Sequence, residues 1–368
     1  MPTYKKQVLA SLLSAAALSF GAVSTATAAE PTCEVDRTIN FGGMSWESNL
    51  VLTDVQRLIL ENGYGCKTEV LPTETLPALA ALERGDLDVN TEIWLNSMGK
   101  IWDDAEARGK VIRSGDLFLG GEAWFIPTYT QERLPELKTA ADLIKFKDEF
   151  QDPEDPNKGR FYGCPAGWAC EVVSTNLFNS LDLNDSFTYY QPGTGAAQKA
   201  ALMSEYRRKN NIAFYYWFPT PLVGSLDLVQ LELPPFDEEK LNCLTDVNCE
   251  NPQPTAYPSN PVFVALNKDF AEEAPQLKAF FDKNEVPLEV INETLAEMED
   301  SGDDSIDVAK WFLAEYPEIW TNWVPEDVAE RVQSSLELGS CIQTKVEFKG
   351  FGPKLNTDKT KKRKLKEQ

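Results

Sequence analysis

The chain has 368 residues, a formal net charge of -23 and no histidine. Without histidine it cannot use Ser-His-Asp or Cys-His catalysis, histidine-ligated metals or a histidine pH switch. So acidic a chain repels the phosphates of nucleic acid and the headgroups of anionic lipids, and we expect neither as a partner.

The first predicted element is a secretory signal peptide. Lys5 and Lys6 precede an apolar run, residues 8–23, which leads into small residues ending at Ala28. The run is too short to span a membrane and lacks the polar face of an amphipathic helix. No later stretch approaches the roughly 20 apolar residues of a membrane span. We therefore expect cleavage after about Ala28 and a periplasmic protein without membrane insertion.

The first part of the mature chain alternates strand and helix signals. We predict strands at 38–41, 67–71, 87–94, 111–119 and 123–127, and helices at 47–61, at 76–83 and up to about 108. The first of these helices has an apolar face and Gly63 as its expected stop. Elements interleaved at this spacing predict an α/β fold with a parallel or mixed sheet covered on both faces.

The middle segment repeats this style with its own elements. We predict helices at 140–150, after Cys170 and at 196–210, a loop at 152–163 and a strand at 212–216. A proline-rich boundary follows, then a strand at 261–266 and helices to about 338. An insertion flanked by two halves of one domain implies two lobes with a cleft, where ligands of open α/β sheets bind.

About 340 mature residues are more than one hydrophobic core usually serves. We therefore predict two lobes, with the chain crossing between them twice. The expected ranges are 1–28 for the signal peptide, 29–127 and 258–340 for lobe 1, 128–257 for lobe 2, and 341–368 for a lysine-rich, disordered tail.

Seven cysteines in an exported chain predict disulfides. Each of two cysteine pairs encloses a short loop. The two cysteines of a third pair each begin a predicted strand, and they would come together if these strands are neighbours in the sheet. The predicted bonds are Cys164–Cys170, Cys243–Cys249 and Cys33–Cys66, which leaves Cys341 over. A zinc site is the alternative, but the pairs are spaced too widely for zinc knuckles and the compartment is oxidising.

Tryptophan placement is the pattern most informative about function. Five of the nine tryptophans fall at predicted strand ends or turns: Trp46, Trp94, Trp124, Trp168 and Trp217. Three belong to one lobe and two to the other, so their side chains could meet in the cleft. The alternative is that they are core aromatics, which we expect of the late helical residues Trp311, Trp320 and Trp323.

The loop 163–171 is the most specific string in the sequence. A disulfide would stiffen it, Gly167 lets the backbone approach a ligand closely, and a helix is expected to begin at about Ala169. The free N–H groups at Gly167, Ala169 and Cys170 could bind an anion such as a carboxylate. Trp168 beside them suits a zwitterion, with cationic methyl groups on the ring and the carboxylate on the amides.

Together, these segments resemble the binding proteins of glycine betaine, proline betaine and choline importers, which have the two-lobed type II periplasmic binding fold. The resemblance covers about 39–323. It is carried by residues 45–48, 61–64, 84–89, 92–94, 124–127, 163–171 and 215–219. It implies that the chain binds a small trimethylammonium ligand and delivers it to an ABC permease and its ATPase. We also expect a monomer without a cofactor.

The resemblance also assigns residues. It implies cage aromatics at Trp94, Trp168 and Trp217, and, as in choline-type members, at Trp46 and Trp124. Met98 stands where glycine betaine binders often have a histidine for the carboxylate. A ligand with a lighter polar end, trimethylamine N-oxide or choline, is the alternative to glycine betaine.

Acidic residues lie near two of the cage positions. Glu122 and Glu47 could accept a hydrogen bond from a ligand hydroxyl or reinforce the attraction for the cation. The alternative for both is a solvated surface acid.

Two further hypotheses remain open. Asp152, Glu154, Asp155 and Asn157 place oxygen ligands at roughly alternate positions, as a calcium loop does, but the full loop pattern is missing and a solvated acidic turn is the alternative.

A secreted carboxylate-based glycoside hydrolase would also use tryptophans, which stack on sugars. Because no paired carboxylates stand out beside the strand-end tryptophans, we expect a binding protein and no enzyme.

Overall fold

The computed structural model describes residues 31–347, with side chains up to residue 338. The predicted signal peptide, most of the predicted tail and the Cys341 side chain lie outside what it describes. Within it, nine strands form one sheet in the order β2-β1-β3-β9-β4-β7-β5-β6, with β8 paired to β4. The strands are β1 (Thr38–Gly43), β2 (Lys67–Pro72), β3 (Val89–Trp94), β4 (Val111–Pro127), β5 (Gly159–Tyr162), β6 (Phe187–Tyr190), β7 (Ala213–Phe218), β8 (Leu228–Gln230) and β9 (Asn260–Asn267).

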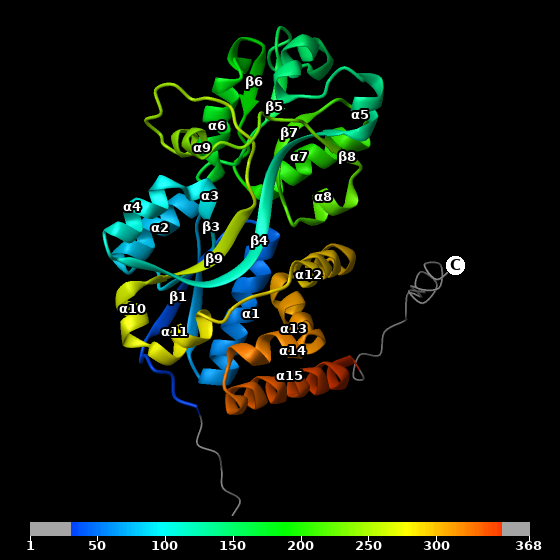
Figure 1. Cartoon of the computed structure of the whole chain (residues 1–368). Helices are drawn as coiled ribbons and strands as arrows, with labels where there is room; N and C mark the ends of the chain where they lie inside the picture. Colours follow the sequence, from blue (N-terminus) through cyan, green and yellow to red (C-terminus); the bar gives the residue numbers. More distant parts are fainter. Residues whose placement is uncertain (1–30, 348–368) are drawn as a thin grey trace, which may run out of the picture. The chain divides into compact units, whose positions relative to one another are not determined.

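Helices pack around both ends of this sheet (Figure 1). Around β1, β2, β3 and β9 lie α1 (Glu47–Tyr64), α2 (Thr75–Arg84), α3 (Leu95–Met98), α4 (Lys100–Ala107), α10 (Lys268–Glu273), α11 (Pro275–Phe281), α12 (Leu288–Ser301), α13 (Ser305–Glu315), α14 (Pro317–Trp320), η3 (Thr321–Trp323) and α15 (Glu326–Glu347). Around β5 to β8 lie α5 (Thr128–Arg133), η1 (Ala140–Phe150), α6 (Cys170–Ser180), η2 (Leu183–Asp185), α7 (Gly195–Arg207), α8 (Pro221–Ser225) and α9 (Glu238–Leu244). The predicted mixed α/β architecture is confirmed.

Strand β4 joins two halves of the sheet. It pairs with β9 up to Gly120, then with β7 from Gly121 onward and with β8 at its end. We call β2, β1, β3, β9 and the start of β4 the first half, and the end of β4 with β7, β8, β5 and β6 the second half. The sequence predicted two strands here, at 111–119 and 123–127, and the structure has one.

Two glycines make this crossing possible. A Cβ on Gly120 would lie 2.5 Å from the Trp94 ring, and one on Gly121 would lie 2.2 Å from the Phe218 ring. The two rings therefore pack directly on the β4 backbone where it changes partner. Trp94 ends β3 and Phe218 ends β7, so the crossing lies at the carboxyl ends of strands from both halves.

Local sequence signals explain most of the boundaries, with two exceptions. The predicted stop of α1 at Gly63 is wrong, because the helix continues to Tyr64 and ends at Gly65, whose φ of 71° is left-handed. Strand β5 lies inside the segment predicted as a loop. It has only four residues, and its pairing with β6 and β7 comes from outside the local sequence.

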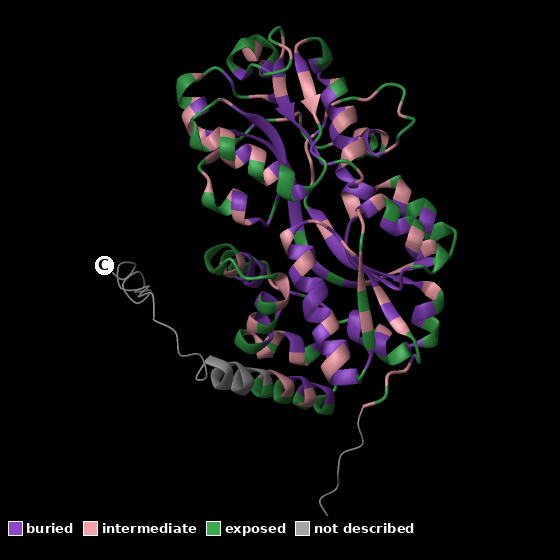
Figure 2. Ribbon diagram, turned by 180° about the vertical axis from the view of Figure 1, so that it is seen from behind, coloured by how far each residue is buried: buried purple, intermediate pink, exposed green. Residues whose placement is uncertain are grey.

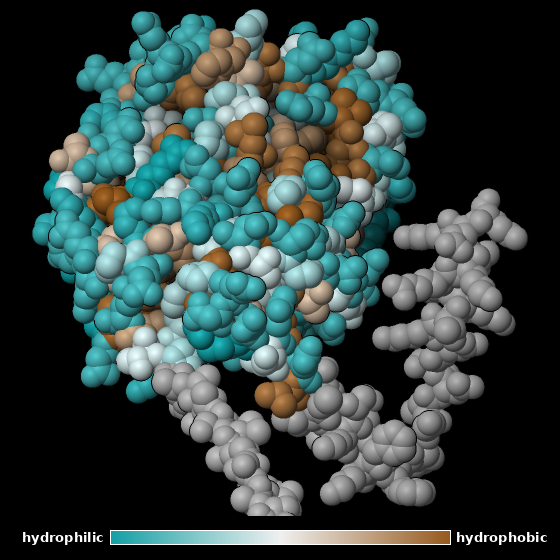
Figure 3. Space-filling model, turned by 60° about the horizontal axis from the view of Figure 1, so that its bottom comes forward, coloured by the Kyte–Doolittle hydropathy of each residue, from teal (hydrophilic) through white to brown (hydrophobic). Residues whose placement is uncertain are grey.

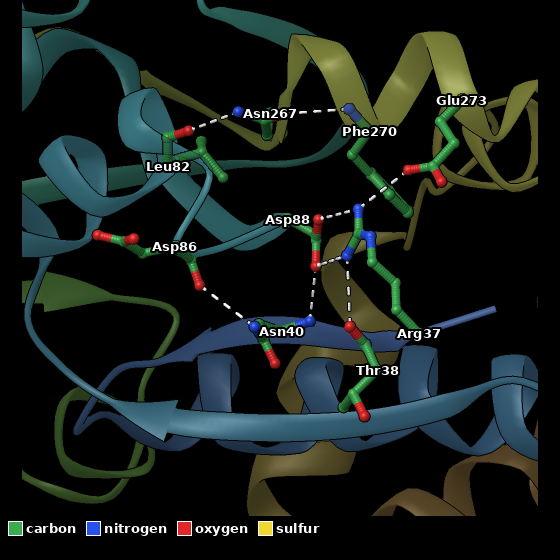
Figure 4. A network of polar contacts seen from close by, with 9 residues as sticks. All are labelled: Arg37, Thr38, Asn40, Leu82, Asp86, Asp88, Asn267, Phe270 and Glu273. Carbon is green, nitrogen blue, oxygen red and sulfur yellow. Dashed lines mark hydrogen bonds and ion pairs between the residues drawn. The ribbon is translucent and has the colours of Figure 1, made fainter. Parts of the chain in front are cut away.

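An ion pair between the exposed Arg37 and the buried Asp88 anchors the start of the first half (Figure 4). The Arg37 guanidinium donates to both carboxylate oxygens of Asp88, at 2.9 and 2.8 Å. The backbone N–H of Asn40 donates to the same carboxylate at 2.8 Å. The contact ties the chain before β1 to the residue that precedes β3, so a charge is buried with its counter-ion beside it.

The predicted cysteine pairs are bonded in the structure: Cys33–Cys66, Cys164–Cys170 and Cys243–Cys249. Figure 2 shows the sheet as the buried layer, with exposed residues on the outward faces of the helices. The face in Figure 3 is mainly hydrophilic, with scattered hydrophobic patches. Among residues 31–347, no helix is long and apolar enough to cross a membrane.

Candidate functional site

A cavity lies where the two halves of the sheet meet. It holds about 320 Å³ of empty space, part of which is open to solvent. Its lining comes from the first half (Trp46, Thr75, Trp94, Ser97), from β4 (Glu122) and from the second half (Trp168, Ala169, Cys170, Tyr215, Trp217). None of these lining residues carries a positive charge, so the cavity suits a small ligand that brings its own cation.

Four indoles line the cavity. The Trp168 ring centroid lies 4.7 Å from that of Trp46 and 4.9 Å from that of Trp217, both in edge-to-face contact. Trp217 also stacks on Tyr216 at 4.3 Å. These contacts join a ring of the first half to two rings of the second half. Indole faces from both halves therefore converge on one cavity.

One wall of the cavity is polar and acidic. The Glu122 carboxylate accepts hydrogen bonds from Ser97 Oγ at 2.6 Å, Asn260 Nδ2 at 2.7 Å and Tyr215 Oη at 2.6 Å. Burial raises the pKa of Glu122, although these three hydrogen bonds lower it. The same carboxyl can accept a hydrogen bond when ionised and donate one when protonated.

The loop before α6 forms another wall. Trp168, Ala169 and Cys170 line the cavity, but Gly167 does not. The Gly167 N–H donates to Glu171 Oε2 at 2.7 Å. This backbone amide, predicted to bind a ligand carboxylate, is therefore already bonded to an acid of the chain.

Hydrogen bonds and ion pairs join the two halves around the cavity. The N–H of Leu76 on α2 donates to Gly167 O at 3.1 Å. On α7, Lys199 Nζ contacts Glu47 at 3.0 Å and Glu299 at 2.6 Å. Both acids belong to helices of the first half, and Lys199 belongs to the second. The structure is therefore held in a conformation in which the two halves touch.

Besides Gly167, three further residues predicted to contact the ligand do not line the cavity. Trp124 is fully buried against Phe161, with ring centroids 4.2 Å apart, in the core of the second half. Met98, the last residue of α3, is also fully buried in the core. Glu47 is engaged by Lys199. The Trp124 ring therefore packs with the core aromatics of the second half and is not part of the cavity lining.

Sequence reasoning missed three lining residues, Thr75, Ser97 and Tyr215. Tyr215 lies in an apolar strand beside Trp217, so alternation along β7 could have suggested that both side chains point the same way. Thr75 begins α2 and Ser97 lies inside the short helix α3, and single small polar residues carry no such signal.

The acidic loop predicted as a calcium site has other contacts. Asp152 Oδ1 accepts from Arg160 at 2.7 Å and from the Glu154 N–H at 2.8 Å. Within the described part of the chain, no group of three or more Cys, Asp or Glu side chains is arranged to hold a metal ion. The structure gives the calcium hypothesis no support.

Comparisons with known proteins agree with this geometry. Residues 37–315 match the family described as the substrate-binding domain of ABC-type glycine betaine transport systems. The chain is 27% identical over 225 residues to the glycine betaine-binding periplasmic protein OusX of Dickeya dadantii, covering 58% of this chain and 65% of that protein. It is 25% identical over 236 residues to the glycine betaine/proline betaine-binding periplasmic protein of Salmonella typhimurium, covering 58% and 70%.

Solved structures match the fold over most of the chain. A choline-binding protein of an ABC transporter, in complex with choline, has a TM-score of 0.66 at 19% identity, covering 81% of this chain and 98% of that one. Lactococcal OpuAC, closed around glycine betaine, has a TM-score of 0.62 at 16% identity, covering 79% and 100%. At this identity the likeness identifies the fold alone, the two-lobed periplasmic binding fold.

Proposed function

The chain belongs to the family of substrate-binding domains of ABC-type glycine betaine transport systems, and on this basis we propose that it binds one trimethylammonium compound inside its tryptophan cage. The observation that carries the proposal is the convergence of Trp46, Trp94, Trp168 and Trp217 on one cavity with no basic residue in its lining. Two of these indoles come from each half of the sheet.

A quaternary ammonium group explains why the wall is aromatic. It has no N–H, so hydrogen bonds cannot select it, and its charge is spread over methyl groups. Indole faces desolvate these methyls and attract the charge, with about 0.5 to 2 kcal/mol from each ring. Part of this energy is lost to the cost of association. Four rings and a few polar contacts then support a binding free energy of about -8 kcal/mol, which corresponds to a micromolar dissociation constant.

The acidic wall influences which polar group the ligand can carry. Glu122 would repel a carboxylate, and the Gly167 amide is engaged by Glu171. A hydroxyl can donate to the ionised Glu122 carboxylate, and an N-oxide oxygen can accept from the protonated form. We therefore expect choline and trimethylamine N-oxide to bind more tightly than glycine betaine.

The ligand reaches its importer through closure of the two lobes. We propose lobe 1 at 29–127 and 258–340 and lobe 2 at 128–257, with the bound, closed form recognised by an ABC permease that works with its ATPase. A monomer in the periplasm, released from a signal peptide, fits this role. The cage chemistry requires neither turnover nor a metal.

Fluorescence of the cage tryptophans provides a direct test. Titration with choline, trimethylamine N-oxide and glycine betaine should give saturable quenching, and a panel of oligosaccharides should be neither bound nor cleaved. Saturable binding of a sugar with release of products would replace the proposal by the hydrolase alternative. Glu122→Gln should reduce the preference for choline over glycine betaine, because it removes the charge that repels the carboxylate.

A further inference from the structure

Two buried acids near the start and end of β3 differ in their partners. Asp88 has the Arg37 guanidinium on both its oxygens (Figure 4). Glu92 is fully buried as well, yet among residues 31–338 no lysine or arginine forms an ion pair with it. Glu92 therefore lacks the counter-ion that Asp88 has.

In place of a cation, Glu92 contacts two walls of the cavity. Its Oε2 accepts from Nε1 of Trp46 at 2.6 Å and from Nε1 of Trp94 at 3.1 Å. Trp46 immediately precedes α1, and Trp94 is the last residue of β3. One carboxylate thus fixes the orientation of two indoles from different elements, and it lies on the N–H edge of both.

The charge of Glu92 is costly for the fold. Burial raises the pKa of Glu92 to about 7, although hydrogen bonds from Trp46, Trp94 and Ser48 lower it. A glutamine oxygen could accept the same two N–H groups without the burial of a charge. An acid at this position is therefore better explained by a use for its charge than by the orientation of the indoles alone.

We propose that Glu92 is a positioning residue that orients the Trp46 and Trp94 indoles and serves as the counter-ion of the bound trimethylammonium group. This rests on the proposed function. An indole N–H bonded to a carboxylate is polarised so that its ring face becomes more negative, which strengthens the attraction for a cation. The carboxylate also attracts the cation directly, through an interior that screens charge far less than water does.

Two substitutions separate orientation from charge. Glu92→Gln keeps an acceptor for both indoles and removes the charge, whereas Glu92→Leu removes both. Calorimetry with tetramethylammonium chloride at pH 8 should give a dissociation constant at least tenfold higher for Glu92→Gln than for the wild type, and higher still for Glu92→Leu. Asp88→Asn is the matched control, since it changes a buried acid outside the cavity and should leave the affinity of the folded protein unchanged.

A neutral ligand shows whether charge is responsible. Choline and 3,3-dimethylbutan-1-ol have the same shape, but the second has carbon in place of the charged nitrogen. Glu92→Gln should raise the dissociation constant of choline at least tenfold and that of the neutral alcohol less than twofold. A merely structural role would weaken both ligands alike.

The pH profile decides the case if the neutral alcohol binds too weakly to measure. Wild-type affinity for tetramethylammonium should be about tenfold higher at pH 8 than at pH 6, since the cation binds best to the ionised acid, and Glu92→Gln should flatten this rise. The other titratable side chains at the cavity are Glu122 on β4 and Tyr215 on β7, with Glu74 nearby before α2. They are unchanged in the variant.

The outcomes separate this proposal from the one on which it rests. If the wild type binds none of tetramethylammonium, choline, trimethylamine N-oxide and glycine betaine, the proposed function fails, and the role of Glu92 fails with it. If the wild type binds them and Glu92→Gln binds them equally well, with an unchanged pH profile, only the role of Glu92 is overturned.

Discussion

Lys199 forms an ion pair with Glu47 across the meeting of the two halves of the sheet, with Nζ and Oε1 3.0 Å apart. Lys199 lies on α7 and Glu47 is the first residue of α1, directly after the cage residue Trp46. Glu299 on α12 lies 2.6 Å from the same ammonium group. This pair of contacts can form only while the lobes touch, so it stabilises the conformation that encloses a ligand.

Lys199→Met should therefore weaken ligand binding by about two- to fivefold, chiefly through faster release. The effect is small because the charges are partly exposed, and it should shrink at high salt, where such pairs are screened. Stopped-flow release of choline at low and high ionic strength provides the measurement. Lys145→Met is the control, because Lys145 pairs with Asp142 within one half. Equal release rates for wild type and Lys199→Met at low salt would contradict this role.

The distinction between cage and core tryptophans predicts opposite effects of one substitution. Trp217→Leu removes an indole face from the cavity and should weaken binding of tetramethylammonium by about 5- to 30-fold. Trp124→Leu opens the core against Phe161 and should lower the free energy of unfolding by about 3 kcal/mol. Its affinity, measured on the folded protein, should remain unchanged.

Urea denaturation and calorimetry on the same two variants provide both measurements. A loss of affinity in Trp124→Leu equal to that in Trp217→Leu would mean that the cavity has been assigned to the wrong rings.

Two disulfides of equal sequence separation provide a second matched pair. Cys164–Cys170 holds the loop that carries Trp168, whereas Cys243–Cys249 lies outside the cavity lining. Replacing either pair by serines should cost about 2 kcal/mol of stability, because each closes a loop of the same length. Only the first replacement should also weaken binding, by releasing Trp168. Equal affinities for both double variants would refute the idea that the loop is held for the ligand.

The buried charge of Glu92 predicts a pH dependence of stability. The folded protein binds the proton of Glu92 more tightly than the unfolded chain does, so stability falls as pH rises from about 4.5 to about 7. Glu92→Gln lacks this loss. It should therefore match the wild type near pH 4 and exceed it by about 3 kcal/mol at pH 8. Urea unfolding across this range tests it, and parallel curves for the two proteins would contradict the burial of a charge.

The sequence predicted the cage where a tryptophan ends a strand or lies in the disulfide loop. Trp94 is the last residue of β3 and Trp217 the second-last residue of β7, and strand ends meet at the cavity because β4 carries the chain from one half to the other. Trp124 was also expected in the cage but packs against Phe161. It lies near the start of the predicted strand 123–127, which in the structure is the far part of β4. Local pattern cannot distinguish these cases, since the difference lies in which strand pairs with β4.

The missed features depend on contacts between distant segments. Strand β5 has four residues, and only its partners β6 and β7 make it a strand. Glu92 shares a face of β3 with Trp94, so alternation could have placed the two side by side. Its bond to Trp46, however, comes from packing of the chain before α1 against β3, which no local signal encodes.

Isothermal titration calorimetry of the wild-type protein with choline, trimethylamine N-oxide, glycine betaine and tetramethylammonium tests the central claim most directly. The account predicts one site per chain, micromolar binding of at least one trimethylammonium compound, and tighter binding of choline or the N-oxide than of glycine betaine. If none of the four gives a binding isotherm while the protein is folded, the tryptophans do not form a cation cage.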